Sequence, residues 1–241
     1  MNVAERLIVA LDDVALGPAL ATARRLRGLI RIVKIGSALF TASGPEAIRR
    51  VRSLGFEVML DLKFFDIPST VEASCRAAVR HGISKLTVHS RGGPAMLEAA
   101  VRGVREEARR RRRTPPDVLG VTVLTSAGDK HAGSVTAEVV RLAQQARAAG
   151  CDGVVASAQE ARALRRRFGA RWQIVCPGIR PAGAAGTLAR KARDDQRRVC
   201  TPRDALEQGA TTLVVGRPIT AARDPRAAAQ EILNEMEWCA C

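Results

Sequence analysis

Three charged residues of alternating sign stand close together where an apolar run ends. In the segment DLKFFDIP (61–68), Asp61, Lys63 and Asp66 follow directly on the apolar residues 58–60. Asp61 and Lys63 are two residues apart, so their side chains face the same way on a strand. Opposite charges ~4 Å apart attract by roughly 4 kcal/mol at an effective dielectric of 20, which favours the protonated lysine. Such a lysine is suited to general acid catalysis rather than to Schiff-base formation.

A second lysine occupies an otherwise apolar segment. Lys34 lies within IVKI (32–35), in a chain that has only five lysines among its 39 basic residues. A buried ammonium group without a partner is costly. We therefore expect Lys34 to join the same charge network as Asp61 and Lys63. Taken alone, these residues leave a purely structural ion-pair cluster as the alternative.

The elements that position these residues follow a repeating pattern of short apolar runs separated by helical segments. The runs cover 7–12, 31–36, 57–63, 85–90, 118–125, 152–157, 172–179 and 211–219. Buried strands that alternate with helices indicate a parallel sheet. Eight such units in 241 residues predict a single-domain (β/α)8 TIM barrel over 1–241. An open doubly wound sheet is the alternative, but no G-x-G-x-x-G follows the first run.

Polar residues and glycines gather at the expected strand ends, which meet at one mouth of a TIM barrel, where active sites lie. They are Asp12, Lys34, Asp61, Lys63, His89, Thr125, Ser157, Arg180, Gly216 and Arg217. Gly216 lets a ligand approach the backbone and Arg217 can bind phosphate oxygens, so the eighth strand end predicts a phosphate site. A plain strand-to-helix turn is the alternative there. His89 receives no catalytic role.

A long segment separates the seventh and eighth strands. It begins with PAGAAG (181–186) and continues into a charged stretch that contains Gln196. Loops of this length are uncommon unless they serve a function. We expect a lid at about 180–200 that closes over the substrate, with Gln196 making contacts once it is shut. A surface insertion is the alternative.

Composition narrows the possible partners. The net charge of +15 suggests a polyanion, but aromatic residues make up only 3% and tyrosine is absent, so base-stacking surfaces are scarce. The basic run 109–113 is expected to close a helix. We predict no nucleic-acid partner, with an RNA-binding protein as the rival interpretation. No apolar run approaches the ~20 residues of a membrane span, and no signal peptide is expected. Six scattered cysteines predict reduced thiols, no metal site and a cytoplasmic location.

The motifs together resemble those of the orotidine 5′-phosphate decarboxylase family. The resemblance rests on DLKFFDIPST (61–70), PGIR (177–180), DQRRV (195–199) and VGRPI (215–219), with VALD (9–12) and VKIG (33–36) in agreement. It implies a homodimer that converts orotidine 5′-monophosphate to UMP and CO₂ without metal or organic cofactor, as the last step of de novo pyrimidine nucleotide synthesis. One departure is a lengthened segment, 186–193, ahead of Gln196.

The resemblance also implies roles for individual residues. Lys63 would donate a proton to C6 of the pyrimidine, with Asp61 beside the departing carboxylate. Asp66, Ile67 and Thr70 would come from the partner subunit and complete a network with Lys34. The remaining expected contacts are Asp12 and Lys34 to the ribose, Thr125 to the pyrimidine, Gln196 to base and phosphate, and Arg180, Gly216 and Arg217 to the phosphate end.

The nearest rival is a group of Mg²⁺-dependent sugar-phosphate decarboxylases and aldolases, which share the fold and a similar Asp-x-Lys-x-x-Asp strand. Those enzymes hold a metal through acidic residues near this strand. Position 59, two residues before Asp61, is Met here, so a further carboxylate on that face is missing.

Overall fold

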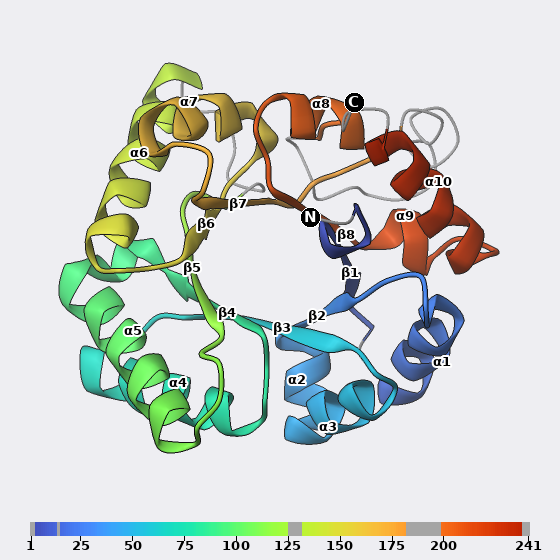
Figure 1. Cartoon of the computed structure of the whole chain (residues 1–241), viewed down its shortest axis with the longest axis horizontal. Helices are drawn as coiled ribbons and strands as arrows, with labels where there is room; N and C mark the ends of the chain where they lie inside the picture. The colour runs from blue at the N-terminus through green and yellow to red at the C-terminus, as the bar shows by residue number, and fades with distance from the viewer. Residues whose placement is uncertain (1–2, 14, 125–131, 182–198, 238–241) are drawn as a thin grey trace.

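Eight parallel strands form a closed ring in the order of the sequence, from β1 to β8 and back to β1 (Figure 1). The computed structural model describes residues 3–13, 15–124, 132–181 and 199–237. The strands are β1 (Leu7–Leu11), β2 (Ile32–Gly36), β3 (Glu57–Phe64), β4 (Lys85–His89), β5 (Asp117–Val121), β6 (Gly153–Val155), β7 (Gln173–Cys176) and β8 (Thr212–Val215). The predicted TIM barrel is confirmed, and the open doubly wound sheet is wrong.

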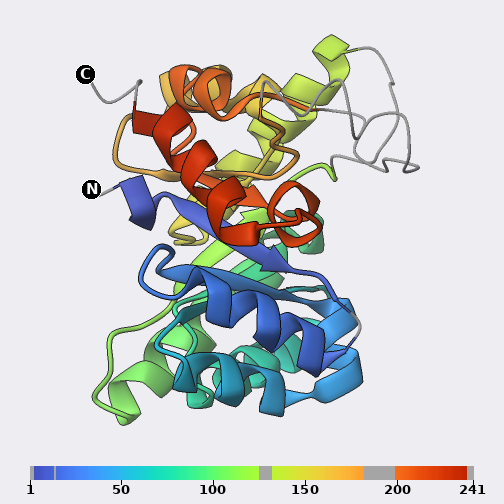
Figure 2. The same cartoon turned by 90° about the vertical axis from the view of Figure 1, so that its right-hand side faces the viewer.

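Helices surround the ring on its outer side (Figure 1). They are α1 (Leu16–Leu26), α2 (Ser37–Ser43), α3 (Pro45–Ser53), α4 (Pro68–Arg80), α5 (Gly93–Arg110), α6 (Ala132–Ala148), α7 (Ala158–Phe168), α8 (Pro202–Glu207), α9 (Arg217–Thr220) and α10 (Pro225–Glu237), with 3₁₀ turns η1 (Val3–Glu5) and η2 (Ser90–Gly92). Figure 2 shows the start of β1 and the end of α10 on the same side of the barrel. No helix among the described residues is both long and apolar enough to cross a membrane.

Two apolar cores hold the barrel together. The larger core lies between the strands and the surrounding helices. The smaller core fills the barrel interior with side chains that include Ile8, Met59, Leu119 and Val175, all of them buried. Side chains alternate along each strand, so a residue two positions further along points inward as well. The polar side chains that follow this apolar layer therefore lie next to it, toward the carboxyl-terminal ends of the strands.

The strand register places the expected site residues side by side. Ala10 of β1 pairs with Lys34 of β2, and Gly36 pairs with Asp61 of β3. Lys34 and Asp61 are therefore brought to neighbouring strands at the same mouth of the barrel. That mouth is the carboxyl-terminal one, where the TIM barrel forms its active sites.

The later strands are shorter than the apolar runs predicted. The structure ends β5 at residue 121 rather than 125, β7 at 176 rather than 179, and β8 at 215 rather than 219. Pro177 has no backbone N–H to continue a strand, and Pro218 lies in the first turn of α9, where proline is favourable. The residues beyond each strand therefore form the mouth of the barrel.

Candidate active site

A cavity of about 870 Å³ opens at the carboxyl-terminal ends of the strands. Its volume lies within the ~300–1,000 Å³ range of small-molecule sites. Residues from β1, β2, β3, β5, β6 and β8, and from the segments after β7 and β8, line it. The predicted residues Asp12, Lys34, Asp61, Lys63, Arg180, Gly216 and Arg217 all belong to this lining.

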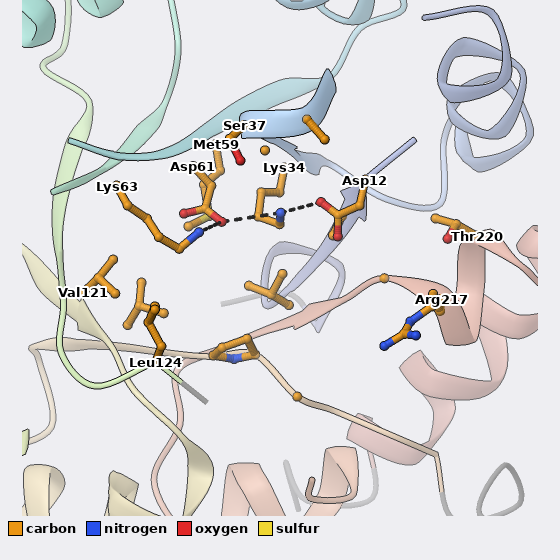
Figure 3. Close-up of a pocket in the computed structure, with 18 of the residues that line it drawn as sticks. Asp12, Lys34, Ser37, Met59, Asp61, Lys63, Val121, Leu124, Arg217 and Thr220 are labelled. Atoms are coloured by element: carbon orange, nitrogen blue, oxygen red, sulfur yellow. Dashed lines mark hydrogen bonds and ion pairs between the residues drawn. The ribbon is translucent and has the colours of Figure 1, made fainter. Parts of the chain in front are cut away.

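Four side chains form a row of alternating charge along one wall of the cavity (Figure 3). Lys63 Nζ lies 3.0 Å from Asp61 Oδ2, and Lys34 Nζ lies 3.4 Å from the same oxygen. Lys34 also donates a hydrogen bond to Asp12 Oδ1 at 2.7 Å. Lys34 thus forms ion pairs with both Asp12 and Asp61.

Burial and charge act in opposite directions on the centre of this row. Burial on its own would lower the pKa of Lys34, but the carboxylates of Asp61 and Asp12 outweigh it and raise that pKa above its ordinary value. Burial would likewise raise the pKa of Asp61, but the ammonium groups of Lys34 and Lys63 lower it. Lys34 and Asp61 thus form a buried, fully ionised pair.

Thr87 of β4 is a site residue that the sequence analysis missed. Its hydroxyl donates to Asp61 Oδ1 at 2.9 Å and accepts the backbone N–H of Lys63 at 3.0 Å. Thr87 is completely buried. Lys63 itself has a left-handed backbone with a φ of 51°, and the β3–β4 register shifts between Leu60 and Phe64. The strand is therefore irregular where a regular one was expected, although the side chains of Asp61 and Lys63 still meet.

The opposite side of the cavity carries the residues expected to hold a phosphate. Figure 3 shows Arg217 and Thr220 of α9 across the pocket from Lys63. Gly216 precedes the helix, and a Cβ atom added there would lie 3.5 Å from Asp12 Oδ2. That is an ordinary van der Waals distance, so packing within the chain does not require glycine at 216. Arg180 lines the same cavity, and its Nη1 donates to the carbonyl of Ile179 at 3.0 Å.

Apolar side chains form another part of the lining and were not predicted as site residues. Val121 and Leu124 lie at the end of the cavity near Lys63 (Figure 3), and Val155 also belongs to the lining. Leu124 is 43% exposed, so part of this apolar surface is accessible from the cavity. An apolar wall with a few charged groups opposite it is typical of small-molecule sites.

Asp66, Ile67 and Thr70 lie outside this cavity. They are exposed in the segment between β3 and the first turn of α4. The Asp66 carboxylate accepts the N–H of Ile67 at 2.6 Å. Ile67 is 63% exposed and Phe65 is 62% exposed, with the Phe65 ring 5.3 Å from that of His89. Within one chain, these residues do not complete the charge network.

Two predicted contacts, Thr125 and Gln196, lie outside the described residues, as does most of the predicted lid at 180–200. The two ends of that segment are described. Ile179 and Cys200 form a parallel bridge, and Arg180 N–H donates to the Cys200 carbonyl at 2.9 Å. The chain therefore leaves the cavity mouth and returns to the same place. In the described part of the chain, no three His, Cys, Asp or Glu side chains are grouped as metal ligands.

Comparison with known proteins gives one family. A profile of the orotidine 5′-phosphate decarboxylase / HUMPS family matches residues 5–232. An orotidine 5′-phosphate decarboxylase of Moorella thermoacetica is 48% identical over 247 residues, covering 98% of this chain and 94% of that protein. One from Halorhodospira halophila is 47% identical, covering 96% of this chain and 95% of that protein.

A solved structure agrees with both the fold and the sequence relationship. The crystal structure of orotidine 5′-phosphate decarboxylase from Lactobacillus acidophilus matches with a TM-score of 0.79 at 34% identity, covering 96% of this chain and 99% of that one. The family match spans the barrel and the whole charge row. The chain therefore belongs to the orotidine 5′-phosphate decarboxylase / HUMPS family.

Proposed function

We propose that this protein is a carboxy-lyase that decarboxylates orotidine 5′-monophosphate to UMP and CO₂, without a metal or organic cofactor. The observation that carries the proposal is the alternating row of Lys63, Asp61, Lys34 and Asp12 on one wall of the cavity. Breaking the bond between C6 and the carboxylate leaves an electron pair on C6. A fixed ammonium beside that carbon stabilises the developing charge electrostatically.

Lys63 is the proton donor in this mechanism. As CO₂ departs, the electron pair left on C6 takes a proton from Lys63 Nζ, and the amine regains a proton from solvent. Asp61, 3.0 Å from Lys63, holds the ammonium in place. It also lies beside the substrate carboxylate, where two like charges disfavour the bound substrate relative to the transition state.

Lys34 and Asp12 position the ribose. Lys34 is bonded to Asp12 at 2.7 Å and keeps Asp61 ionised from the side opposite Lys63. The Asp12 side chain is 60% exposed toward the cavity mouth, so its oxygens are available to sugar hydroxyl groups. One buried ion pair thus fixes both the catalytic carboxylate and the sugar-binding one.

The phosphate is held at the far side of the pocket. Arg217 lies on that side (Figure 3), Arg180 and Gly216 also line the cavity, and the guanidinium geometry suits phosphate oxygens. We assign the pyrimidine contact to Thr125 and the contact bridging base and phosphate to Gln196. The segment 180–200 acts as a lid, because both of its ends are anchored at the cavity mouth. Binding energy from the phosphate then helps to assemble the closed site.

A homodimer completes each active site. Asp66, Ile67 and Thr70 of one chain enter the neighbour's cavity, which extends the charge row to Lys34–Asp61–Lys63–Asp66. The exposure of Phe65 and Ile67 supports this arrangement, since adjacent large apolar side chains on a surface mark interaction sites. Isologous pairing is the commonest form of oligomer.

Mixing two inactive variants tests the shared site. Lys63→Ala and Asp66→Ala should each be inactive as homodimers. Mixed dimers contain one doubly altered site and one intact site, so co-refolding should recover roughly a quarter of the wild-type activity. No recovery in a preparation shown to contain mixed dimers would contradict the shared site.

The function itself is tested by following the absorbance of orotidine 5′-monophosphate with purified protein, with and without EDTA. We expect turnover that the chelator leaves unchanged. Turnover that requires Mg²⁺ would favour the metal-dependent group, and no absorbance change would refute the proposal. RNA binding that is salt-sensitive and independent of Lys63 would instead favour the RNA-binding interpretation.

A cytoplasmic enzyme without nucleic-acid partners is part of the same proposal. Cys75, Cys151 and Cys176 are free and buried, and burial raises the pKa of each thiol to about 12. Thiols of this kind stay protonated and unreactive, which suits a reducing compartment.

A further inference from the structure

Thr87 contributes one buried hydroxyl that contacts both reactive residues of β3. The hydroxyl accepts the backbone N–H of Lys63 at 3.0 Å and donates to Asp61 Oδ1 at 2.9 Å. Thr87 has no exposed surface, and it enters the site from the neighbouring strand β4. A single side chain therefore connects the main chain of one catalytic residue to the carboxylate of the other.

The bond to Lys63 occurs where the sheet is interrupted. Regular β3–β4 pairing stops after Leu60 and resumes at Phe64. Between them Lys63 has a φ of 51°, in the left-handed region that long side chains rarely adopt. Among the described non-glycine residues only Arg112 has a similar φ, and it lies just past the end of α5. The hydroxyl of Thr87 thus replaces a strand partner and holds the Lys63 backbone in this conformation.

The bond to Asp61 determines which carboxylate oxygen faces which partner. Thr87 occupies Oδ1, whereas Lys34 and Lys63 both contact Oδ2. Because the Thr87 hydroxyl already accepts the Lys63 N–H, its single hydrogen is directed to Asp61. This fixes the carboxylate plane and, with it, the place of the Lys63 ammonium.

We propose that Thr87 is a positioning residue for decarboxylation, acting through Asp61 and Lys63 without touching the substrate. The effect of Thr87 on the reaction rate rests on the proposed function. Its structural consequence, the fixed orientation of Asp61, does not depend on the substrate. Arg217, the proposed phosphate contact, lies across the pocket from Lys63 (Figure 3), so substrate affinity should depend little on Thr87.

Three variants separate positioning from simple structural support. Thr87→Val keeps the shape and removes the hydroxyl, and Thr87→Ser restores the hydroxyl. Thr122→Val is the matched control, because Thr122 is equally buried but its hydroxyl donates to the Val155 carbonyl at 2.9 Å, away from the charge row. We expect Thr87→Val to lower kcat by about 10- to 100-fold with KM changed less than about threefold. Thr87→Ser should recover most of kcat, and Thr122→Val should stay within about twofold of wild type.

Crystal structures of the variants give a second readout that does not need turnover. In Thr87→Val we expect the Asp61 carboxylate to rotate and the contact between Asp61 Oδ2 and Lys63 Nζ to lengthen from 3.0 Å. If Thr87→Val does not fold, Thr87→Ser and Thr87→Cys can be compared instead. The hydroxyl of Thr87→Ser is the stronger hydrogen-bond donor, so this variant should have the higher kcat. An unchanged Asp61 and kcat in Thr87→Val, or an equal loss in Thr122→Val, would overturn the proposal. Wild-type protein inactive on orotidine 5′-monophosphate would instead refute the proposed function.

Discussion

Gly36 offers a sharp test of how closely the charge row is packed. It ends β2 with an extended backbone (φ −90°, ψ 179°) that alanine also adopts. A Cβ atom built there would lie 3.1 Å from Asp12 Oδ1 and 3.1 Å from Lys34 Nζ. A Gly36→Ala substitution should therefore leave the main chain unstrained and act on these two charged atoms alone.

The size of the effect follows from these distances. Both atoms have to move by a few tenths of an ångström to reach ordinary contact. Lengthening the 3.4 Å separation of Lys34 and Asp61 by about 0.4 Å costs only about 0.5 kcal/mol at an effective dielectric of 20. Replacing glycine lowers the entropy of the unfolded chain, which stabilises by about 0.4–1 kcal/mol. The free energy of unfolding should hence change by less than about 1 kcal/mol.

Activity should respond much more strongly than stability. A misplacement of about 1 Å in a catalytic group can cost roughly 100-fold in rate, so a shift of a few tenths should lower kcat/KM about 3- to 10-fold. Steady-state decarboxylation and urea unfolding of the same preparation measure the two effects. Gly17→Ala in α1, where an added Cβ meets nothing within 4 Å, is the control and should keep full activity. Full activity in Gly36→Ala, or a loss that parallels unfolding, would refute this reasoning.

Two other substitutions test the centre and the far side of the pocket. Asp61→Asn should reduce the free energy of unfolding by about 3–5 kcal/mol near neutral pH, because it leaves Lys34 buried with less compensation. The pKa of Asp61 is lowered from its ordinary 3.8, so its contribution to stability is present above pH 3.8 and is lost as the pH falls toward the folded-state pKa. In urea unfolding from pH 6 to about 2.5, the difference between the two proteins should therefore become smaller below pH 3.8. A constant difference would contradict this. Arg217→Ala should lower kcat/KM about 10- to 100-fold, because a charged hydrogen bond to phosphate contributes about 1.5–3 kcal/mol. Arg223, which is not part of the cavity lining, provides the control, and Arg223→Ala should leave kcat/KM unchanged. Equal effects of the two arginine substitutions in steady-state kinetics would exclude a specific phosphate contact.

Most of the fold, and the charged part of the site, could be predicted from the pattern of strands in the sequence. Apolar runs separated by helices predicted the closed barrel, and the spacing of Asp61 and Lys63 predicted their contact. Lys34 was predicted to join them because an unpaired ammonium in an apolar run is unfavourable. These inferences worked because they depend on periodicity and charge, which are local properties of the sequence.

What the sequence did not reveal depends on contacts between strands. Thr87 reads as an ordinary β-branched residue within a strand, and only the register shift between β3 and β4 brings its hydroxyl to Asp61 and Lys63. Alternation along β4 does place Thr87 on the same inward face as Lys85, which was the available signal. Leu124 of the apolar wall likewise has no chemical signature in the sequence.

The role of Lys63 as proton donor is tested most directly by CO₂ release from carboxyl-labelled orotidine 5′-monophosphate. Lys63→Met and Lys85→Met form a matched pair, since Lys85 also lies inside the barrel but bonds Asp117 and Gln173 and is not part of the cavity lining. We predict that folded Lys63→Met releases no label above the uncatalysed rate in EDTA-containing buffer, while folded Lys85→Met retains turnover. Label release by folded Lys63→Met at a rate near that of the wild type would contradict the mechanism.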